Sequence, residues 1–481
     1  MMHRYQHEAG KLMLPTRVVP RSSSSLFVFR SEEGLFYVPT LIYPSLERFQ
    51  TRKGKVMGIW EELEERGLVN QVTEKEGLKN QLNNGQLRFY CGFDPTGDSL
   101  HIGHLLTIIL MRRMQLHGHQ PIALVGGGTG MIGDPSGRNV ERSLNEPKIV
   151  EGFSHKIRTQ LEKYLDFDGA YGAEIVNNHD WLGSMTLISF LRDFGKHFSV
   201  NYMLAKESVE SRIQEGISFT EFSYQIMQSI DFYYLYKNHH CTLQIGGSDQ
   251  WGNITAGLEL IRRLEYEDEE KSPAYGMTIP LVTKADGTKF GKTAGYAIWL
   301  DPEKTSPYEM YQFLLNTDDR DVLKFIRYFT FIDQEEMKEL EQKMQTAPEK
   351  REAHRRLAQE ITSFVHGREA LNQAENITKA LFGGGELTAL TADEIAQGFK
   401  DVPSYTMEAE EQNLVDLLVQ AGIAGSKRQA REDVQNGAVY INGEREQSTD
   451  KTVGNNDLID DQFIIMRKGK KKYFLILKNN G

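Results

Sequence analysis

The chain has 481 residues, of which 39% are hydrophobic and 26% charged, a composition typical of a globular protein with room for two or three domains. It contains no apolar run near the roughly 20 residues that a membrane-spanning helix needs, so no membrane partner is expected. Its two cysteines, Cys91 and Cys241, exclude a disulfide framework and fit a reducing, cytoplasmic setting, while a net charge of −11 argues against unspecific coating of nucleic acid but allows a local basic face.

The first 56 residues differ in composition from the rest of the chain. Basic side chains far outnumber the four acidic ones, and residues 22–25 are all serine, as a transit peptide would allow. A second interpretation is preferred: residues 52–55 (RKGK) can be encoded by purines alone, as a ribosome-binding site is, and Met57 opens an amphipathic helix pattern. We therefore predict that Met57 is the true start and that residues 1–56 are a non-native leader or a disordered extension.

Short apolar strands alternate with helix-length amphipathic segments from Met57 to Tyr275, for example the strands at 87–91 and 121–125. Alternation of this kind predicts an α/β domain in which helices cover a parallel sheet. One helix is expected from about residue 101 to residue 117, after a turn at 94–99 that supplies its N-cap.

Two histidines, His101 and His104, lie in the first turn of that predicted helix, where the spacing i, i+3 places them side by side. Unpaired backbone N–H groups and the positive end of the helix dipole suit a phosphate there, and Gly103 leaves space for a flat purine. Two alternatives are a plain polar surface and a metal pair, although zinc would need a third ligand that this spacing does not supply.

The segment Gly128–Gly133 matches the pattern GxGxxG directly after the strand at 121–125, which by itself suggests a dinucleotide-dependent dehydrogenase. The last glycine of that fingerprint lies in the first turn of a long helix. Here residues 134–137 (DPSG) break the chain again, so we predict no such helix and set the dehydrogenase aside.

Tyr224, Gln228 and Asp231 are spaced four and three residues apart, so they share one face of a predicted helix whose other faces are apolar. A phenol, an amide and a carboxylate in apolar surroundings suit a small zwitterion with a polar tip. The alternative is the solvated face of an amphipathic helix.

A basic loop with glycines at 287, 291 and 295 contains the sequence KFGKT at 289–293. The ammonium groups of Lys289 and Lys292 can reach one anion and stabilise the charge that develops on a leaving pyrophosphate. A lysine-rich loop is a weak signal by itself. Together with the histidine pair it predicts a nucleoside triphosphate site.

The remaining chain divides by composition. After a connector at 276–305, residues 306–385 have helical spacing, residues 386–412 are acidic and contain proline as a linker does, and residues 413–481 form a small module.

In this last module a predicted helix carries Lys427, Arg428 and Arg431, and a cationic turn follows at 467–472. Together they predict a basic surface for a nucleic acid backbone, with a solvated charge run as the alternative.

The motifs at 101–104 (HIGH) and 289–293 resemble the two signatures of class I aminoacyl-tRNA synthetases, and the segments 90–96, 133–137 and 244–253 are similar to bacterial tyrosyl-tRNA synthetases. The resemblance runs from about Met57 to the C terminus. It implies an α/β fold with a Rossmann-like catalytic domain at 57–275, a mobile KFGKT loop and connector at 276–305, a helical anticodon-binding domain at 306–385 and an S4-like α+β RNA-binding domain at 413–481.

The resemblance also implies partners and site residues. The partners are L-tyrosine, ATP with Mg²⁺ as substrate, tRNA-Tyr and a second copy in a homodimer, and no protein-bound metal is expected. Tyrosine would be bound by Tyr90, Asp134, Tyr224, Gln228, Asp231 and Gln250. ATP would be bound by Cys91, Gly92, Asp94, Gly103, Asp249 and Lys292. The catalytic residues would be Thr96, His101, His104, Arg138, Arg142, Lys289, Lys292 and Thr293. The tRNA would be contacted by Lys427, Arg428, Arg431, Arg467, Lys468, Lys470 and Lys471.

In this family Tyr90 and Asp231 would bond the phenol of tyrosine, and Asp134, Tyr224 and Gln228 would hold its ammonium group. The carboxylate attacks the α-phosphate in line, so charge stabilisation suffices and no general base is needed. Two alternatives stay open: the tryptophan-specific homologue, against which Tyr90 and Asp231 argue, and an RNA-binding protein that has kept the scaffold.

Overall fold

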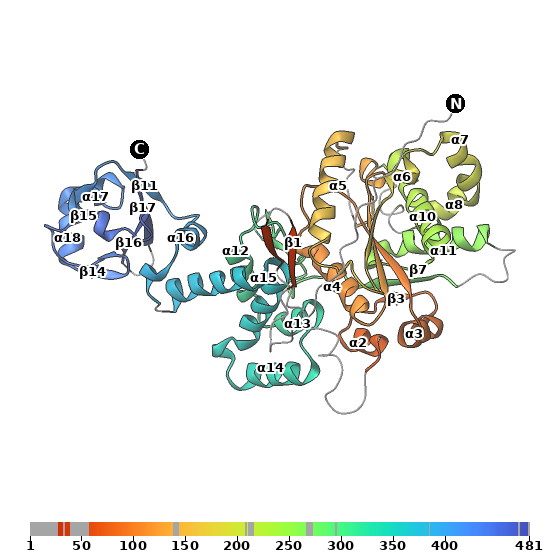
Figure 1. Ribbon diagram of the computed structural model, residues 1–481, viewed down its shortest axis with the longest axis horizontal. Coiled ribbons are helices and arrows are strands. Elements are labelled where there is room, and N and C mark those ends of the chain that lie inside the picture. Colours follow the sequence, from red (N-terminus) through yellow and green to blue (C-terminus); the bar gives the residue numbers. More distant parts are fainter. Residues whose placement is uncertain are drawn as a thin grey trace. The chain divides into compact units, whose positions relative to one another are not determined.

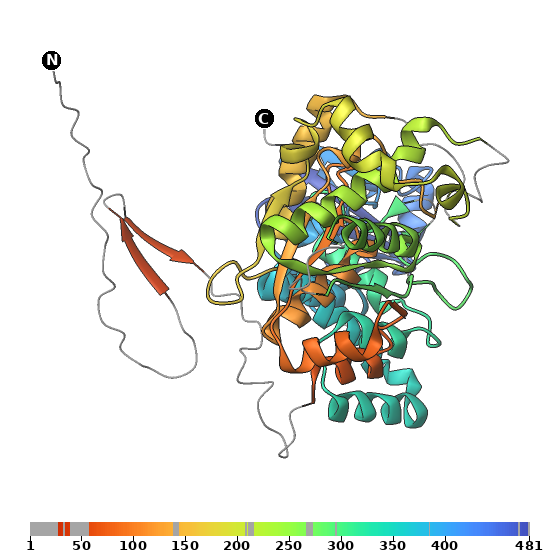
Figure 2. The ribbon, with the colours of Figure 1, turned by 90° about the vertical axis from the view of Figure 1, so that its right-hand side faces the viewer.

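The computed structural model describes residues 27–31, 34–38, 57–137, 144–206, 209, 216–265, 273–293, 296–383, 385–469 and 472–479, and for residues 27–31, 34–38, 292, 293 and 296 it describes the backbone alone. The chain divides into a unit Met1–Val56 and a unit Met57–Gly481. In the first unit, strands β1 (Phe27–Ser31) and β2 (Gly34–Val38) form an antiparallel hairpin (Figure 2). The rest of the predicted leader lies outside the described residues, and its origin stays a prediction.

A six-stranded sheet, covered by helices, forms the N-terminal part of the second unit (Figure 1). Its strands are β3 (Gln71–Val72), β4 (Arg88–Phe93), β5 (Gln120–Val125), β6 (Glu174–Asn177), β7 (Cys241–Gly247) and β8 (Tyr275–Ile279). In space the order is β3-β8-β7-β4-β5-β6, and all neighbours run parallel except the edge pair β3 and β8. The predicted parallel sheet is confirmed. The boundary predicted at Tyr275 is too early, because β8 is buried along its length and belongs to the sheet.

Helices cover both faces of this sheet, with α4 and α5 on one side and α10 and α11 on the other (Figure 1). Their bounds are α2 (Ile59–Glu65), α3 (Lys75–Asn84), α4 (Ile102–Leu116), α5 (Pro147–Leu161), α6 (His179–Leu182), α7 (Leu187–Ser189), α8 (Val200–Leu204), α10 (Phe219–His239) and α11 (Trp251–Leu264). The chain leaves β4 toward β5 on one side and returns to β7 on the other. In open parallel sheets, ligands bind at the carboxyl ends of the strands between which the order reverses, which here are β4 and β7, so a crevice for ligands is expected there.

The region after the sheet is helical, as its spacing predicts. Its helices are α12 (Pro307–Leu315), α13 (Val322–Phe329), α14 (Gln334–Thr346) and α15 (Glu352–Phe382). A capping box of Ser306 and Glu309 starts α12, and Gly367, with φ +88°, interrupts α15 because it adopts a conformation that other residues avoid.

The C-terminal region begins earlier than predicted. The expected linker at 386–412 contains helix α16 (Ala392–Gly398) and strand β11 (Ser404–Met407), so that prediction is wrong. The physical reason is Met407, which is 3% exposed and packs into the C-terminal core, while β11 pairs in parallel with the last strand, β17 (Lys472–Lys478). The acidic composition of this segment thus gave no sign of an edge strand with one buried residue.

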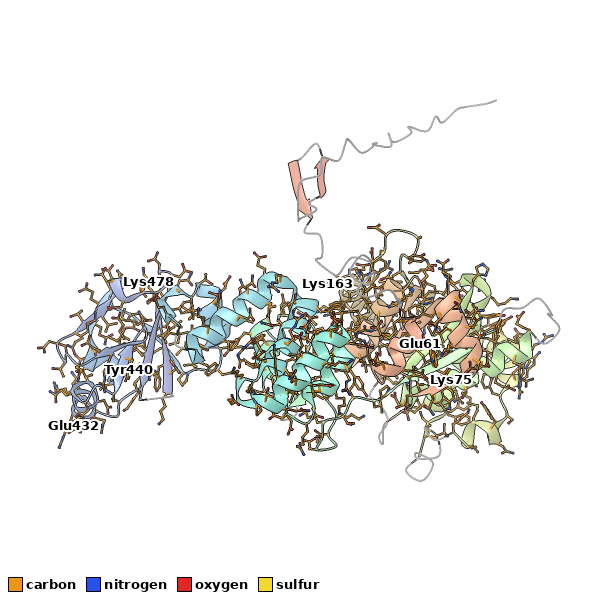
Figure 3. All side chains as sticks on the ribbon, turned by 90° about the horizontal axis from the view of Figure 1, so that it is seen from below. Glu61, Lys75, Lys163, Glu432, Tyr440 and Lys478 are labelled. Atoms are coloured by element: carbon orange, nitrogen blue, oxygen red, sulfur yellow. The ribbon has the colours of Figure 1, made fainter. Side chains whose placement is uncertain are left out.

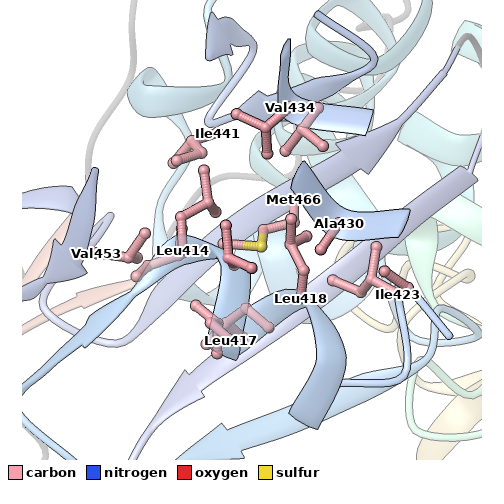
Figure 4. Packing of buried hydrophobic residues seen from close by; sticks show 14 of the residues in the cluster. Leu414, Leu417, Leu418, Ile423, Ala430, Val434, Ile441, Val453 and Met466 are labelled. Carbon is pink, nitrogen blue, oxygen red and sulfur yellow. The ribbon is translucent and has the colours of Figure 1, made fainter. Parts of the chain in front are cut away.

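The C-terminal core lies between two helices and a five-stranded sheet. The remaining elements are β12 (Glu411–Asn413), α17 (Leu414–Gln420), α18 (Lys427–Gln435), β13 (Val439–Ile441), β14 (Glu444–Glu446), β15 (Thr452–Gly454) and β16 (Phe463–Lys468). Leu414, Leu418, Ala430 and Met466 meet in this core (Figure 4). In the described part of the chain, no helix is both long and apolar enough to cross a lipid bilayer.

Candidate active site

The two histidines of the HIGH segment lie at the start of α4, where His101 is the N-cap. Their rings stack with centroids 3.9 Å apart. His101 Nδ1 accepts the N–H of Gly103 at 3.0 Å, and His104 Nδ1 accepts the N–H of His101 at 3.1 Å, which forms a capping box. The predicted helix and the adjacent imidazoles are confirmed.

The prediction of unpaired backbone N–H groups in this turn is wrong. The N–H of Ile102 donates to the carbonyl of Ile298 at 2.8 Å, and that of His104 donates to the carbonyl of His101 at 2.8 Å. The N-cap also is not one of the polar residues at 94–99. The reason is that the side chains of His101 and His104 cap the first turn of the helix, so its first amides are already paired.

Asp231, on α10, is a buried carboxylate beside an apolar cluster that includes Trp181. Its side chain is 2% exposed and accepts two hydrogen bonds, from Trp181 Nε1 at 2.8 Å and from Asn178 Nδ2 at 2.9 Å. Burial raises the pKa of Asp231 to about 7, although both donors oppose the rise and the charge of Asp94 adds to it.

The Tyr90 side chain, on β4, is 1% exposed, and its hydroxyl has no hydrogen-bond partner among the described residues. Burial raises its pKa well above the usual range, and the nearby charge of Asp231 is the second cause. Apolar residues surround this ring, among them Leu124 and Phe232. An unpaired buried hydroxyl is costly, so the pocket is complementary to a ligand with a polar atom at this depth.

A second hydrogen-bond network lies nearer the carboxyl ends of the strands. Asp134 Oδ2 accepts Gln250 Nε2 at 2.7 Å, and Gln250 Oε1 accepts Gln228 Nε2 at 3.3 Å. Asn253 Nδ2 donates to the amide oxygens of Gln228, at 3.0 Å, and Gln250, at 3.2 Å. Three residues predicted from separate segments therefore meet in one place.

The two networks share α10. The hydroxyl of Tyr224 donates to Asp94 Oδ2 at 2.8 Å, and Thr129 donates to Asp94 Oδ1 at 2.7 Å. Asn178 Nδ2 donates to Thr129 Oγ1 at 2.9 Å and to Asp231. Hydrogen bonds through Asp94, Thr129 and Asn178 thus link Tyr224 with Asp231. The predicted common face of Tyr224, Gln228 and Asp231 is confirmed.

Sequence reasoning did not assign roles to four residues of these networks: Thr129, Asn178, Trp181 and Asn253. A usable signal was present for Asn178, because it directly follows the strand at 174–177 and so lies at the same sheet edge as the other site residues. Thr129 sits within the GxGxxG segment. That segment forms a 3₁₀ turn (Thr129–Met131), and in the described residues that follow it, up to residue 137, the chain is not helical.

The side of the crevice expected to hold ATP is only partly described. Cys91 is buried, and burial raises the pKa of its thiol to about 12, with the charge of Asp249 adding to the rise. Burial raises the pKa of Asp249, the charge of Asp134 adds to it, and the charge of Lys289 opposes it. Lys289 therefore lies within electrostatic reach of the carboxylate expected to face the ribose.

Several predicted residues lie outside the described part of this site. Arg138 and Arg142 are not described, and Lys292 and Thr293 are described only as the backbone strand β9 (Lys292–Thr293). Thr96 and Gly92 are exposed in the loop and strand beside the histidine turn. Among the described residues, no group of three or more His, Cys, Asp and Glu side chains is arranged to hold a metal ion.

The predicted tRNA-binding cations lie on α18 and β16. Lys427 pairs with Asp416 at 2.7 Å, and Arg428 pairs with Glu432 at 3.1 Å. Both cations stay exposed in these pairs, so the predicted basic surface for a nucleic acid backbone stays a prediction, with two of its cations beside carboxylates. Arg431 is exposed on the same helix.

The cationic turn is also partly engaged within the protein. Arg467 stacks on Tyr440, 3.6 Å from the ring centroid (Tyr440 is labelled in Figure 3). Lys468 pairs with Asp433 at 2.6 Å. Lys470 and Lys471 lie outside the described residues.

Comparison with known proteins extends over most of the chain. Residues 82–383 match the family of tRNA synthetases class I (W and Y), and residues 394–476 match the tyrosine–tRNA ligase SYY-like C-terminal domain. Tyrosine–tRNA ligase 1 of Bacillus subtilis is 62% identical over 418 residues, which cover 86% of this chain and 98% of that protein. The chain belongs to the tyrosine–tRNA ligase family. The resemblance inferred from the motifs is thereby confirmed, and the linker correction agrees with the start of the second match at residue 394.

Two further similarities support this assignment. Tyrosine–tRNA ligase of Oceanobacillus iheyensis is 59% identical over 423 residues, covering 87% of this chain and 99% of that protein. The crystal structure of a C-terminally truncated mitochondrial tyrosyl-tRNA synthetase from Aspergillus nidulans has a TM-score of 0.62 at 29% identity, covering 70% of this chain and 98% of that one. The fold class predicted from the sequence is thus that of the family.

Proposed function

We propose that the crevice activates L-tyrosine with ATP to give tyrosyl-adenylate and pyrophosphate, and then transfers the tyrosyl group to the 3′ end of tRNA-Tyr. The observation that carries this proposal is the burial of the Tyr90 hydroxyl and the Asp231 carboxylate near each other beside one apolar cluster. A phenol bound there would donate to the Asp231 carboxylate and accept from the Tyr90 hydroxyl, which has no hydrogen-bond partner among the described residues.

The second network is placed to hold the other end of the amino acid. Asp134, Tyr224 and Gln228 offer oxygen atoms to an ammonium group, and Gln250 offers an amide N–H to a carboxylate. The amino acid is then fixed at both ends, which directs its carboxylate toward the α-phosphate.

We assign the phosphate side to hydrogen-bond donors and one cation. His101 and His104, whose Nδ1 atoms accept backbone N–H groups, would offer their Nε2–H groups from the helix start together with the hydroxyl of Thr96, and Lys289 would approach from its loop. These donors and the charge of Lys289 would stabilise the departing pyrophosphate. Lys292, Thr293, Arg138 and Arg142 belong to the same proposal, as do Cys91, Gly92, Gly103 and Asp249 for the adenosine, and magnesium accompanies ATP as part of the substrate.

The test is exchange of labelled pyrophosphate into ATP by the full chain, with tyrosine, phenylalanine or tryptophan. Exchange that depends on tyrosine alone is the expected result. Exchange with tryptophan would contradict the pocket assignment and favour the tryptophan-specific homologue. No exchange with any amino acid, from folded protein, would favour an RNA-binding protein that has kept the scaffold.

We also propose a homodimer. Large apolar side chains are exposed between residues 187 and 219, and the most exposed of those described are Leu187 (69%), Ile188 (69%), Val200 (61%) and Phe219 (72%). A second copy of the chain would remove such side chains from water. Sedimentation of Ile188→Asp should show a shift toward monomer. Phe382→Asp is the control, because Phe382 is exposed to 72% but lies outside this surface; equal behaviour of both variants would contradict the proposal.

A further inference from the structure

The loop that carries Lys289 is held from outside the catalytic sheet by helix α13. Lys324 Nζ donates to the carbonyl of Thr283 at 2.6 Å, and Asp321 Oδ2 accepts the N–H of Ala285 at 2.8 Å. Lys324 and Asp321 also pair with each other at 3.2 Å, and Asp321 is 2% exposed. The strand-like stem of the loop is thus fixed to the first turn of α13 at two backbone positions.

The stem transmits this attachment to Lys289 because the loop is a tight hairpin. Thr283 and Lys289 form an antiparallel bridge, and the N–H of Lys284 donates to the carbonyl of Thr288 at 2.8 Å. Gly287, with φ +81°, makes the turn, and Asp286 Oδ1 accepts both the N–H and the hydroxyl of Thr288. A displacement of Thr283 or Ala285 therefore moves Lys289 as well.

Phe290, directly after Lys289, provides a third attachment to the helical region. Its side chain is 6% exposed, and its ring centroid lies 4.3 Å from that of Phe325 and 5.3 Å from that of Phe329, both on α13. Phe313 of α12 completes the aromatic cluster at 5.5 Å. Phe290, which lies within the KFGKT motif, is therefore part of the core of the helical region.

The same loop and the same helix both contact α4. Gly291 adopts φ +85°, and a Cβ there would overlap the side chain of Ile102 in the histidine turn. At the other end of α13, the carbonyl of Thr330 accepts Arg113 Nη2 at 2.6 Å, and Arg113 is a fully buried residue of α4. Helix α13 is thus in contact with the supports of both catalytic signatures.

We propose that Asp321 and Lys324 are positioning residues that set the distance between Lys289 and the histidine turn. They act through the loop and do not touch the substrate. This inference rests on the proposed function, because it assumes that Lys289 stabilises the leaving pyrophosphate. It predicts that their loss slows adenylate formation and leaves the binding of tyrosine unchanged, since the tyrosine pocket lies on α10 and β4, away from α13.

The test compares Lys324→Met, Asp321→Ala and the conservative Lys324→Arg in the full chain. Lys324 is 35% exposed, so its substitution is compatible with folding. For Lys324→Met and Asp321→Ala we expect the exchange rate at saturating tyrosine to fall about tenfold, as for the loss of one charged hydrogen bond, with an unchanged tyrosine Kd in equilibrium dialysis. Lys324→Arg should restore most of the rate.

Lys343→Met is the matched control, because it breaks a comparable pair with Glu352, at 3.0 Å, in the same helical region but away from the loop. If Lys324→Met and Asp321→Ala exchange at the wild-type rate, or if Lys343→Met slows exchange equally, the positioning role is wrong. A parallel loss of tyrosine binding would also overturn it. Absence of exchange by the wild-type chain would instead overturn the proposed function.

Discussion

The proposed tyrosine pocket and the C-terminal basic surface differ in how their charged and polar groups are buried and paired. In the pocket, Asp231 is buried and its oxygens accept from Asn178 and Trp181, while one hydroxyl, that of Tyr90, is left unpaired. On α18 the cations are exposed, and Arg428 is paired with Glu432. Under the proposed function, tyrosine would supply the missing partner of the Tyr90 hydroxyl. A nucleic acid phosphate that binds Arg428 would instead have to displace Glu432.

The energetic consequences differ accordingly. Leaving a buried polar group unpaired costs about 1–3 kcal/mol, so each missing contact in the pocket has a measurable effect on binding. An exposed ion pair contributes only about 0–1 kcal/mol and is screened by salt, so exchanging its partner costs little. The pocket is therefore suited to selectivity and the C-terminal surface to salt-dependent affinity.

The largest expected effect concerns the buried carboxylate of Asp231 in the proposed tyrosine pocket. Asp231→Ala removes the acceptor for two buried donors and for the substrate phenol, so tyrosine-dependent exchange should need about 100-fold more tyrosine, equivalent to roughly 3 kcal/mol. Steady-state exchange at varied tyrosine measures this. Asp231→Asn, which keeps one acceptor oxygen, is the control and should lose less, and exchange by the Ala variant at the tyrosine concentration of the wild type would show that Asp231 is not the phenol partner.

The pH dependence of tyrosine binding is the next effect in size. The pKa of Asp231 is about 7 in the ligand-free protein, so the carboxylate that accepts the phenol is lost as the pH falls through 7. Tyrosine should bind about tenfold more weakly at pH 6 than at pH 8, and Asp231→Asn should flatten this pH profile of tyrosine binding. A flat profile for the wild type would contradict the burial argument.

The raised pKa also affects the stability of the ligand-free protein. Because the pKa of Asp231 is higher in the folded than in the unfolded state, the free energy of unfolding should fall as the pH rises from about 4 to 7.

Tyr90→Phe tests the unpaired hydroxyl and has opposite effects on the empty and filled pocket. Removing a buried hydroxyl that has no described partner should raise the free energy of unfolding of the ligand-free protein by up to about 1 kcal/mol. The same change should lower the preference for tyrosine over phenylalanine by up to about tenfold. Thermal unfolding and exchange with both amino acids measure the two effects. Destabilisation of the empty protein would mean that the hydroxyl is satisfied.

The sequence predicted the pocket better than the surfaces around it. Tyr224, Gln228 and Asp231 were found because helical spacing alone places them on one face, and that face is the same in any fold. Trp181 was not found, because only tertiary packing brings its short helix, α6, against α10. The amides of the histidine turn were assigned wrongly, since histidine is an unusual N-cap.

The difference between local spacing and tertiary packing also explains which features of the C-terminal region could be predicted. The strand β11 was assigned to a linker because its pairing with β17 joins segments about 70 residues apart, which no local pattern reports. The pair of Arg428 and Glu432, in contrast, has the spacing i, i+4 and was visible in the sequence. Acidic neighbours of the cations can therefore be read from the sequence, while the contact of this surface with tRNA stays a prediction.

The smallest predicted effect tests the exposed side of the comparison. Glu432→Gln releases Arg428 from its acid partner, so tRNA should bind about twofold to fivefold more tightly at low salt, since the exposed pair is worth about 0–1 kcal/mol. The gain should shrink as salt rises, because screening weakens the original pair as well as the new contact. Titration of tRNA at several salt concentrations measures both. Glu444→Gln, an exposed carboxylate on β14, removes the same charge without releasing an arginine. If both variants gain equally, net charge and not the freed Arg428 controls binding, and α18 is not the contact surface.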